Sequence, residues 1–209
     1  MAKLKAPLFS FGASGKLADS LVFTPWKGLN NVRQYVVPAN PKTDAQNTQR
    51  GYVHAAVDKI HAALVLAAQP LVAADKSAYA LWGSTYPTPR TWFNQAVKNW
   101  VDTKVKVKKA NIFRAGLCSA PAHGAAVVQV YFSEETPGSM VNGKFYLGTS
   151  KTALIKIKAG GLIAGPAFTN GAAPYDDLVA GVTYYFQFRA DVADPSEYCQ
   201  SGIYFFKAT

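Results

Sequence analysis

Residues 37–50, VPANPKTDAQNTQR, mark the point where one kind of structure gives way to another. A residue before proline avoids the helical region, so Pro38 and Pro41 should end a preceding strand and keep the chain extended. Thr43 is a good helix N-cap, and Asp44 follows at the positive end of the helix dipole. The stretch therefore predicts a strand exit, a stiff corner and a helix start. It serves either as a corner within the chain or as part of an interface.

The residues before this corner have the pattern of a β-hairpin. Two strand-like runs, DSLVFTPW and NVRQYVVP, flank Gly28 and the Asn30–Asn31 pair, which supply turn chemistry. Leu21, Phe23 and Pro25 would share one face of the first strand.

The residues after the corner have helical periodicity. One stripe of apolar side chains recurs at three- and four-residue spacing, which predicts a long amphipathic helix: Val53, Ala56, Val57, Ile60, Ala63, Leu64 and Ala67. VAADKSAYALWGS predicts a shorter helix, capped by Asp75 and ended at Gly83, and RTWFNQAVKNWVD predicts a third. TKVKVKKAN then predicts a strand or linker that leaves the helical part.

From about residue 110 the apolar pattern changes to period two. AAVVQVYF, GKFYLGTS, ALIKIKA, VTYYFQFRAD and GIYFFKAT are strand-like, with Gly, Pro, Asn and Asp between them. Several strands at short spacing indicate a β-sandwich. We therefore predict an α+β chain with two domains: a hairpin and helices over 1–109, and an all-β sandwich over 110–209.

The net charge of +10 lies entirely in the first half of the chain. Residues 1–109 hold fifteen basic and five acidic side chains, whereas residues 110–209 hold seven of each. A surface of this kind suits nucleic acid, an anionic membrane or an acidic protein, and it can also serve solubility alone. No apolar run reaches the ~18 residues of a membrane helix, and the N-terminus has no signal-peptide pattern, so we expect no membrane partner.

Short motifs for cofactors and metals are weak. FGASGKLADS contains Gly-Lys, but its spacing differs from that of a phosphate-binding loop, so a glycine turn is the preferred interpretation. His54, Asp58 and His61 share one flank of the long helix, where they form either a metal site or a helical His–Asp pair. A closed metal site needs a fourth ligand, and none is placed nearby. We predict no cofactor and no metal.

Residues for catalysis are also sparse. His123 lies in a turn, Glu134 and Glu135 lie in a polar turn, and Gly-x-Ser-x-Gly is absent, so we expect no enzyme. Cys118 and Cys199 are either two thiols or one bridge within the second half.

The lysines of KVKVKK form a candidate contact surface. On an extended strand, Lys104, Lys106 and Lys108 would project to one side and could contact phosphates. No aromatic residue is interleaved for base stacking, so a lysine-protected edge strand is the preferred alternative.

The first part of the chain resembles a pattern found in small structural proteins of tailed phages and prophages. The pattern is a strand, Lys-Gly, an Arg, and then Pro-x-Asn-Pro-x-Thr-x-x-Gln-x-x-x-Arg at the opening of a helix. It is carried here by Lys27, Gly28, Arg33, Pro38, Asn40, Pro41, Thr43, Gln46 and Arg50. A Trp in a second helix follows in those proteins, as Trp82 does here. The resemblance covers about the first 85 residues and implies a place in a virion.

The second half is similar to a fibronectin type III or immunoglobulin-like domain. Leu178, Gly181 and Tyr184 have the spacing of the tyrosine corner of that fold. The usual core Trp is missing, so Val128, Val130 and Phe145 would fill its space. Such domains can also bind host glycans weakly, which is an inference by fold analogy.

These observations lead to one expectation of function. We expect a non-enzymatic virion protein in capsid decoration, head–tail joining or tail attachment, made in the host cytoplasm. Its partners would be other virion proteins and copies of itself, with a host-surface glycan or nucleic acid as alternatives. Gln46 and Arg50 are one helical turn apart and project together. The candidate interface residues are Trp26, Lys27, Arg33, Asn40, Thr43, Gln46, Arg50, Lys104, Lys106 and Lys108.

Overall fold

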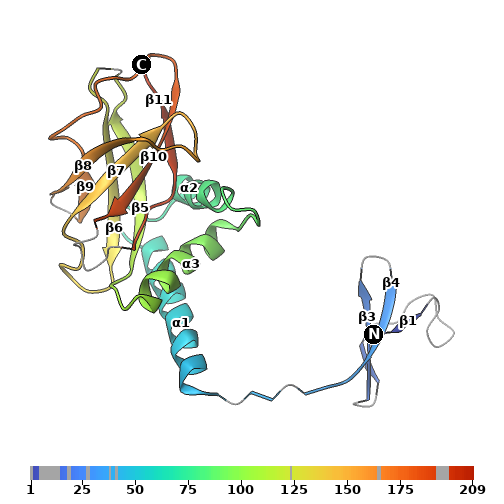
Figure 1. Cartoon of the computed structure of the whole chain (residues 1–209). Helices are drawn as coiled ribbons and strands as arrows, with labels where there is room; N and C mark the ends of the chain where they lie inside the picture. The colour runs from blue at the N-terminus through green and yellow to red at the C-terminus, as the bar shows by residue number, and fades with distance from the viewer. Residues whose placement is uncertain are drawn as a thin grey trace. The chain divides into compact units, whose positions relative to one another are not determined.

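The chain divides into two compact units, Met1–Thr43 (unit 1) and Asp44–Thr209 (unit 2), coloured from blue to red in Figure 1. The computed structural model describes residues 2–4, 15–17, 20–26, 29–37, 39–40, 42–122, 124–163, 166–191 and 198–209. Lys27, Gly28, Pro38, Pro41 and His123, which carry part of the sequence patterns above, lie outside these residues.

Unit 1 contains a four-stranded antiparallel sheet with the order β1-β4-β3-β2. The predicted hairpin is confirmed, because β3 (Leu21–Trp26) pairs with β4 (Leu29–Gln34) and places Phe23 opposite Val32. Phe23 is buried, whereas Leu21 and Pro25 on the same strand are exposed. The flanking strands β1 (Ala2–Leu4) and β2 (Gly15–Leu17) were not predicted from the sequence.

Three helices open unit 2: α1 (Asp44–Leu64), α2 (Ala73–Gly83) and α3 (Trp92–Val105). Helix α1 begins directly after Thr43, as predicted. Its apolar stripe is buried only at Ala56, Ile60 and Ala63, in the second half of the helix. The hydroxyl of Thr91 caps α3 by accepting a hydrogen bond from the amide of Asn94. None of the helices in the described residues is long and apolar enough to cross a membrane.

Of the two alternatives predicted for TKVKVKKAN, a strand or a linker, the strand is wrong, because α3 continues to Val105 and a turn follows. The Val-Lys alternation has the period of a strand, but tertiary contacts hold the residues in the helix. Thr103 is buried and donates to the carbonyl of Asn99 one helical turn earlier. Val107 then adopts a positive φ of 60° in the turn. The tertiary contacts of neighbouring residues therefore decide the structure of this short run, and its alternating pattern does not.

Seven strands complete unit 2, in the order β11-β10-β7-β8-β9-β6-β5, with every neighbouring pair antiparallel. They are β5 (Asn111–Ala120), β6 (Val127–Glu134), β7 (Gly143–Gly148), β8 (Lys156–Ile163), β9 (Ala167–Thr169), β10 (Thr183–Ala190) and β11 (Tyr204–Lys207). The expected mixture of helices and antiparallel strands is thus confirmed. The first part of β8 pairs with β7 and its last three residues pair with β9.

The sheet folds back on itself around aromatic side chains. Phe168 on β9 and Phe188 on β10 belong to strands that are not neighbours, yet their rings stack with centroids 4.5 Å apart. The centre of the Phe188 ring also lies 5.6 Å from the centre of the Phe113 ring on β5. Rings from distant strands meet in this way only if the sheet encloses them. Cys118 and Cys199 are both thiols and are not joined by a disulfide.

The division into units falls at residues 43 and 44, and not at the predicted boundary near residue 109, because the helices and the strands of unit 2 share one core. Tyr79 on α2 donates its hydroxyl proton to the carbonyl of Phe113 on β5 and accepts from the amide of the same residue. The amide of Ile203 donates to the carbonyl of Ala78 at 3.0 Å. In Figure 1 the three helices lie beside one end of the folded sheet.

Candidate functional site

The N-terminal half of α1 is an exposed part of unit 2. Every residue from Asp44 to Gly51 is exposed, and the first buried residue of the helix is Ala56. Figure 1 shows this half of α1 extending away from the other helices and the strands of unit 2. Gln46 and Arg50, two of the predicted interface residues, lie here and are both exposed. The structure therefore places them on a surface and not in a corner packed within unit 2.

A shallow groove of about 480 Å³ runs along this part of α1. Its apolar element is Val53, which is 43% exposed, together with the half-buried Val57. Arg50, His54 and Asp58 give it a polar border, and Nδ1 of His54 lies 2.8 Å from Oδ2 of Asp58. Among the described residues, no three His, Cys, Asp or Glu side chains gather as a metal site would require. His54 and Asp58 form the helical pair that was one of the two alternatives predicted from the sequence.

The other predicted interface residues among residues 1–43 are spread over unit 1, including its C-terminal end. Arg33 is exposed on β4 opposite Val22, and Trp26 is the last residue of β3. Asn40 and Thr43 are exposed and belong to neither a helix nor a strand. Lys27 lies outside the described residues.

The three predicted lysines do not form a row. Lys104 is on α3, where its Nζ lies 2.8 Å from Oε1 of Glu135. Lys106 is exposed, with Nζ 5.7 Å from the centre of the Tyr198 ring, and Lys108 is half-buried. Because the segment is the end of a helix and a turn, the strand-like array that would contact phosphates is absent from these described residues.

Glu135 shows how strongly the environment of Lys104 is organised. Burial alone would raise the pKa of Glu135, but the hydrogen bond from Lys104 and another from the amide of Ala110 outweigh it. The nearby charges of Lys104 and Lys109 act in the same direction. The pKa of Glu135 is therefore held below its usual value, and Lys104 is committed to this ion pair.

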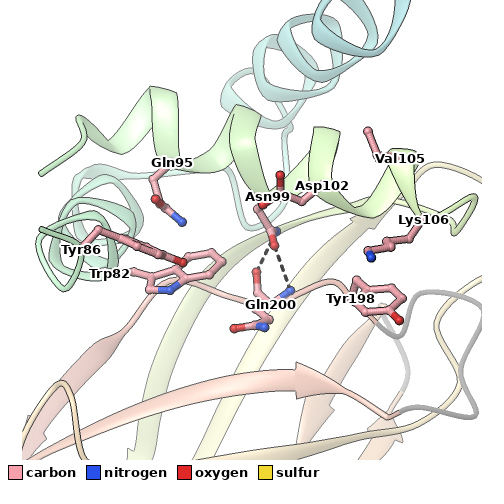
Figure 2. Close-up of a pocket in the computed structure, with 9 residues that line it drawn as sticks. All are labelled: Trp82, Tyr86, Gln95, Asn99, Asp102, Val105, Lys106, Tyr198 and Gln200. Atoms are coloured by element: carbon pink, nitrogen blue, oxygen red, sulfur yellow. Dashed lines mark hydrogen bonds between the residues drawn. The ribbon is translucent and has the colours of Figure 1, made fainter. Parts of the chain in front are cut away.

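A pocket that was not predicted from the sequence lies between α2, α3 and residues 198–200. It has a volume of about 330 Å³ and is shown in Figure 2, lined by Trp82, Tyr86, Gln95, Asn99, Asp102, Val105, Lys106, Tyr198 and Gln200. Side chains from three separate stretches of sequence thus converge on one concave surface. The available signal was the helical spacing of three polar residues, Gln95, Asn99 and Asp102, along one side of the third predicted helix.

The middle of this pocket is fixed by paired hydrogen bonds between Asn99 and Gln200. Nδ2 of Asn99 donates to the carbonyl of Gln200 at 3.0 Å, and the amide of Gln200 donates to Oδ1 of Asn99 at 3.3 Å. Figure 2 shows Trp82, Tyr86 and Gln95 at one end of the pocket and Lys106 with Tyr198 at the other. The pocket is therefore a preformed hollow with aromatic ends and a polar middle.

The chain was compared with family models, with curated proteins and with solved structures, and none of the three comparisons finds a match.

Proposed function

We propose that this protein is a non-enzymatic structural component of a tailed-phage or prophage virion, which docks through unit 1 and the exposed half of α1. Capsid decoration, head–tail joining and tail attachment are the candidate roles. The motif resemblance over the first 85 residues supports the virion assignment. The observation that carries the docking surface is the exposure of every residue from Asp44 to Gly51.

Helices in proteins owe most of their stability to packing of one face, and short helical segments are marginal in water. The first two turns of α1 have no packed face within unit 2, although Val53 and Val57 offer an apolar one at the next turn. A protein partner would supply the missing packing. We therefore assign this groove to a contact with another virion protein.

The charge of unit 1 supports an acidic partner. Residues 1–43 hold six basic side chains and one acidic side chain, a net charge of +5. Complementary potentials accelerate association and exclude wrong partners. The partner surface in the particle would accordingly be rich in Asp and Glu.

We also propose that the strands of unit 2 form an immunoglobulin-like sandwich, which the particle presents outward. The strand order, with one strand shared between two groups of strands, supports this assignment. The hydroxyl of Tyr184 accepts a hydrogen bond from the amide of Val179 at 2.9 Å, near Gly181 with φ of 80°. This is the contact expected of a tyrosine corner. Val128, Val130 and Phe145, which we expect in place of the core Trp of such a sandwich, are fully buried.

Mass spectrometry of purified particles, with copy number per virion, tests this proposal. The wild-type protein should be present at a fixed copy number. Arg50→Glu should lower that number at least about tenfold, equivalent to 1.4 kcal/mol, because it places a negative charge against an acidic partner. The matched control is Lys207→Glu, which reverses an exposed charge on β11 and should incorporate normally. Absence of the wild-type protein from all particle preparations would contradict the virion role, and normal incorporation of Arg50→Glu would contradict the docking surface.

A second candidate function, nucleic-acid binding, is favoured by the same charge on unit 1. Its signature would be affinity that needs no other virion protein and falls steeply with added salt. A filter-binding titration of the purified chain with duplex DNA at low salt tests it. Absence of binding there would exclude this candidate.

A further inference from the structure

We propose that the pocket between α2, α3 and residues 198–200 binds one pyranose ring of a neutral saccharide. This inference is independent of the docking surface on α1, since the two share no residue. It also differs from glycan binding by exposed aromatic residues of the strands, because the pocket is built mainly on helices.

The two ends of the pocket supply aromatic surfaces. Trp82 and Tyr86 stand at one end and Tyr198 at the other, as Figure 2 shows. Trp82 is 8% exposed, and the guanidinium carbon of Arg90 lies 4.2 Å from the centre of the Tyr86 ring, so this end offers the edges of its rings. Tyr198 is 45% exposed, and Nζ of Lys106 lies 5.7 Å from the centre of its ring, so a ligand would meet the ring together with this ammonium group. Aromatic rings offer a large apolar surface with a polar handle, and the C–H face of a pyranose is an apolar surface of matching shape. A volume of about 330 Å³ is at the small end of ligand pockets and suits a single ring.

Between these ends, amide groups are available for hydroxyl groups. Gln95 is 1% exposed, and its Oε1 accepts from Nη1 of Arg90 at 3.4 Å. Among the described residues the amide nitrogen of Gln95 finds no acceptor, and Figure 2 shows it directed toward Trp82. Gln95 lines the pocket, so a ligand acceptor can bond to this nitrogen. The side-chain amide of Gln200 likewise has no partner among the described residues.

The frame that holds these groups is rigid before any ligand arrives. The paired hydrogen bonds of Asn99 fix the backbone of Gln200, which lies 101 positions away in the chain. Lys98 binds one carboxylate oxygen, Oδ2, of Asp102, and the other oxygen is left for a ligand. Preorganised groups spend less free energy on ordering when they bind. Amide and carboxylate side chains together provide the donors and acceptors that a row of hydroxyl groups requires.

The charges of the pocket point to a neutral ligand. The charged side chains that line it, Asp102 and Lys106, have opposite signs, and Asp102 is also paired with Lys98. An anion is attracted by Lys106 but repelled by Asp102, and a cation meets the reverse, so neither finds charges of a single sign in the lining. A polyhydroxylated ring can bond to both of them without carrying a charge of its own.

Saturation-transfer NMR and calorimetry on the full chain test the proposal, with the methyl glycosides of glucose, galactose, mannose and N-acetylglucosamine as probes. At least one glycoside should bind, with millimolar affinity. That affinity should be unchanged when salt rises from about 0.05 to 0.5 M, because no net charge is involved. Tyr198→Ala and Gln200→Ala should each weaken binding at least about tenfold, the equivalent of 1.4 kcal/mol.

Two matched controls separate the pocket from the strand surface. Phe205→Ala removes an exposed aromatic ring on β11 and should leave glycoside binding unchanged. Asp102→Asn changes a carboxylate of the pocket and should weaken binding, whereas Asp176→Asn, its control outside the pocket, should leave binding unchanged. Circular dichroism establishes that each variant is folded. The proposal is overturned if no glycoside binds, or if Phe205→Ala abolishes binding while Tyr198→Ala preserves it. It is also overturned if glycine, tested as a charged probe, binds in a salt-dependent manner and the glycosides do not.

Discussion

Asp75 is a buried carboxylate whose hydrogen bonds join distant parts of unit 2. Its Oδ1 accepts from the hydroxyl of Tyr204 at 2.8 Å and from the amide of Gly116 at 3.4 Å. Its Oδ2 accepts from the amide of Val72 at 2.8 Å, at the start of α2. Burial and the charge of Asp75 both raise the pKa of Tyr204, so this phenol stays protonated and remains a donor. One side chain thus caps a helix and holds two strands.

We expect Asp75→Ala to lower the free energy of unfolding by about 3 kcal/mol, because it leaves a buried hydroxyl and a helix cap without their acceptor. Tyr204→Phe should cost about 1.5 kcal/mol, since it removes one hydrogen bond to a charged group. Denaturant unfolding measures both. In the Asp75→Ala background, Tyr204→Phe should cost far less, and equal cost in both backgrounds would show that the two side chains are not coupled.

Glu135 makes the stability of unit 2 depend on pH. Its pKa in the folded protein lies below the usual value of 4.5, so the folded state favours the ionised form more than the unfolded chain does. This contribution is present above pH 4.5 and is lost as pH falls through the folded pKa. Urea unfolding between about pH 6 and pH 3 should therefore show a smaller acid-induced loss of stability in Glu135→Gln than in the wild type. Parallel pH curves for the two proteins would contradict this assignment.

At the scale of elements, the turn before β10 depends on one hydroxyl. Tyr184→Phe removes the acceptor of the Val179 amide and should destabilise unit 2 by about 1 kcal/mol in denaturant unfolding. The neighbouring Tyr185 is half-buried and packs against Phe205. Tyr185→Phe is the matched control and should change stability by less than about 0.5 kcal/mol. Equal effects would mean that the hydrogen bond contributes nothing to this turn.

Elements with strong local signals could be predicted from the sequence, and those decided by distant contacts could not. The β3–β4 hairpin and the start of α1 at Asp44 follow from turn residues, prolines and a cap within a few positions. The end of α3 depends instead on Thr103 and Lys104, which contact Cys199 and Glu135 far along the chain. A short period-two pattern carries too little information to compete with such contacts.

The candidate sites divide in the same way. Gln46 and Arg50 could be placed on one exposed side of a helix, because helical spacing alone fixes that relation. The pocket could not, since Asn99 meets Gln200 only when α3 packs against the chain between β10 and β11. The sequence shows several of its residues as polar positions on a helix, but only the fold brings them together in one pocket.

At the scale of the whole molecule, α2 connects the two ends of the sheet of unit 2. Strands β11 and β5 end the strand order, and Asp75 on α2 bonds to a residue of each. A Cβ atom on Gly202 would lie 2.7 Å from the carbonyl carbon of Ala78, so the chain before β11 approaches α2 as closely as glycine allows. An exposed strand edge invites pairing with other chains. The helix protects the edges and joins them into one unit.

Removal of residues 1–43 should leave the remainder folded. The core of unit 2 is built from α1 onward, and the boundary between the two compact units lies between Thr43 and Asp44. The truncated chain 44–209 should unfold in one transition, with a free energy within about 1 kcal/mol of the corresponding transition of the full chain. Calorimetry of both chains provides the measurement. An unfolded or aggregated 44–209 chain would show that unit 1 belongs to the same cooperative structure.

The stretch from Tyr35 to Thr43 has a consequence for the kinetics of the proposed docking. In its described residues it forms neither helix nor strand, and nine residues span at most about 30 Å. Once α1 is bound to a particle, this short tether keeps unit 1 at an effective concentration in the millimolar range near its own target. Each contact can then be weak and quickly reversible on its own, while the two together persist. A misplaced copy, held by one contact only, would dissociate and correct its position.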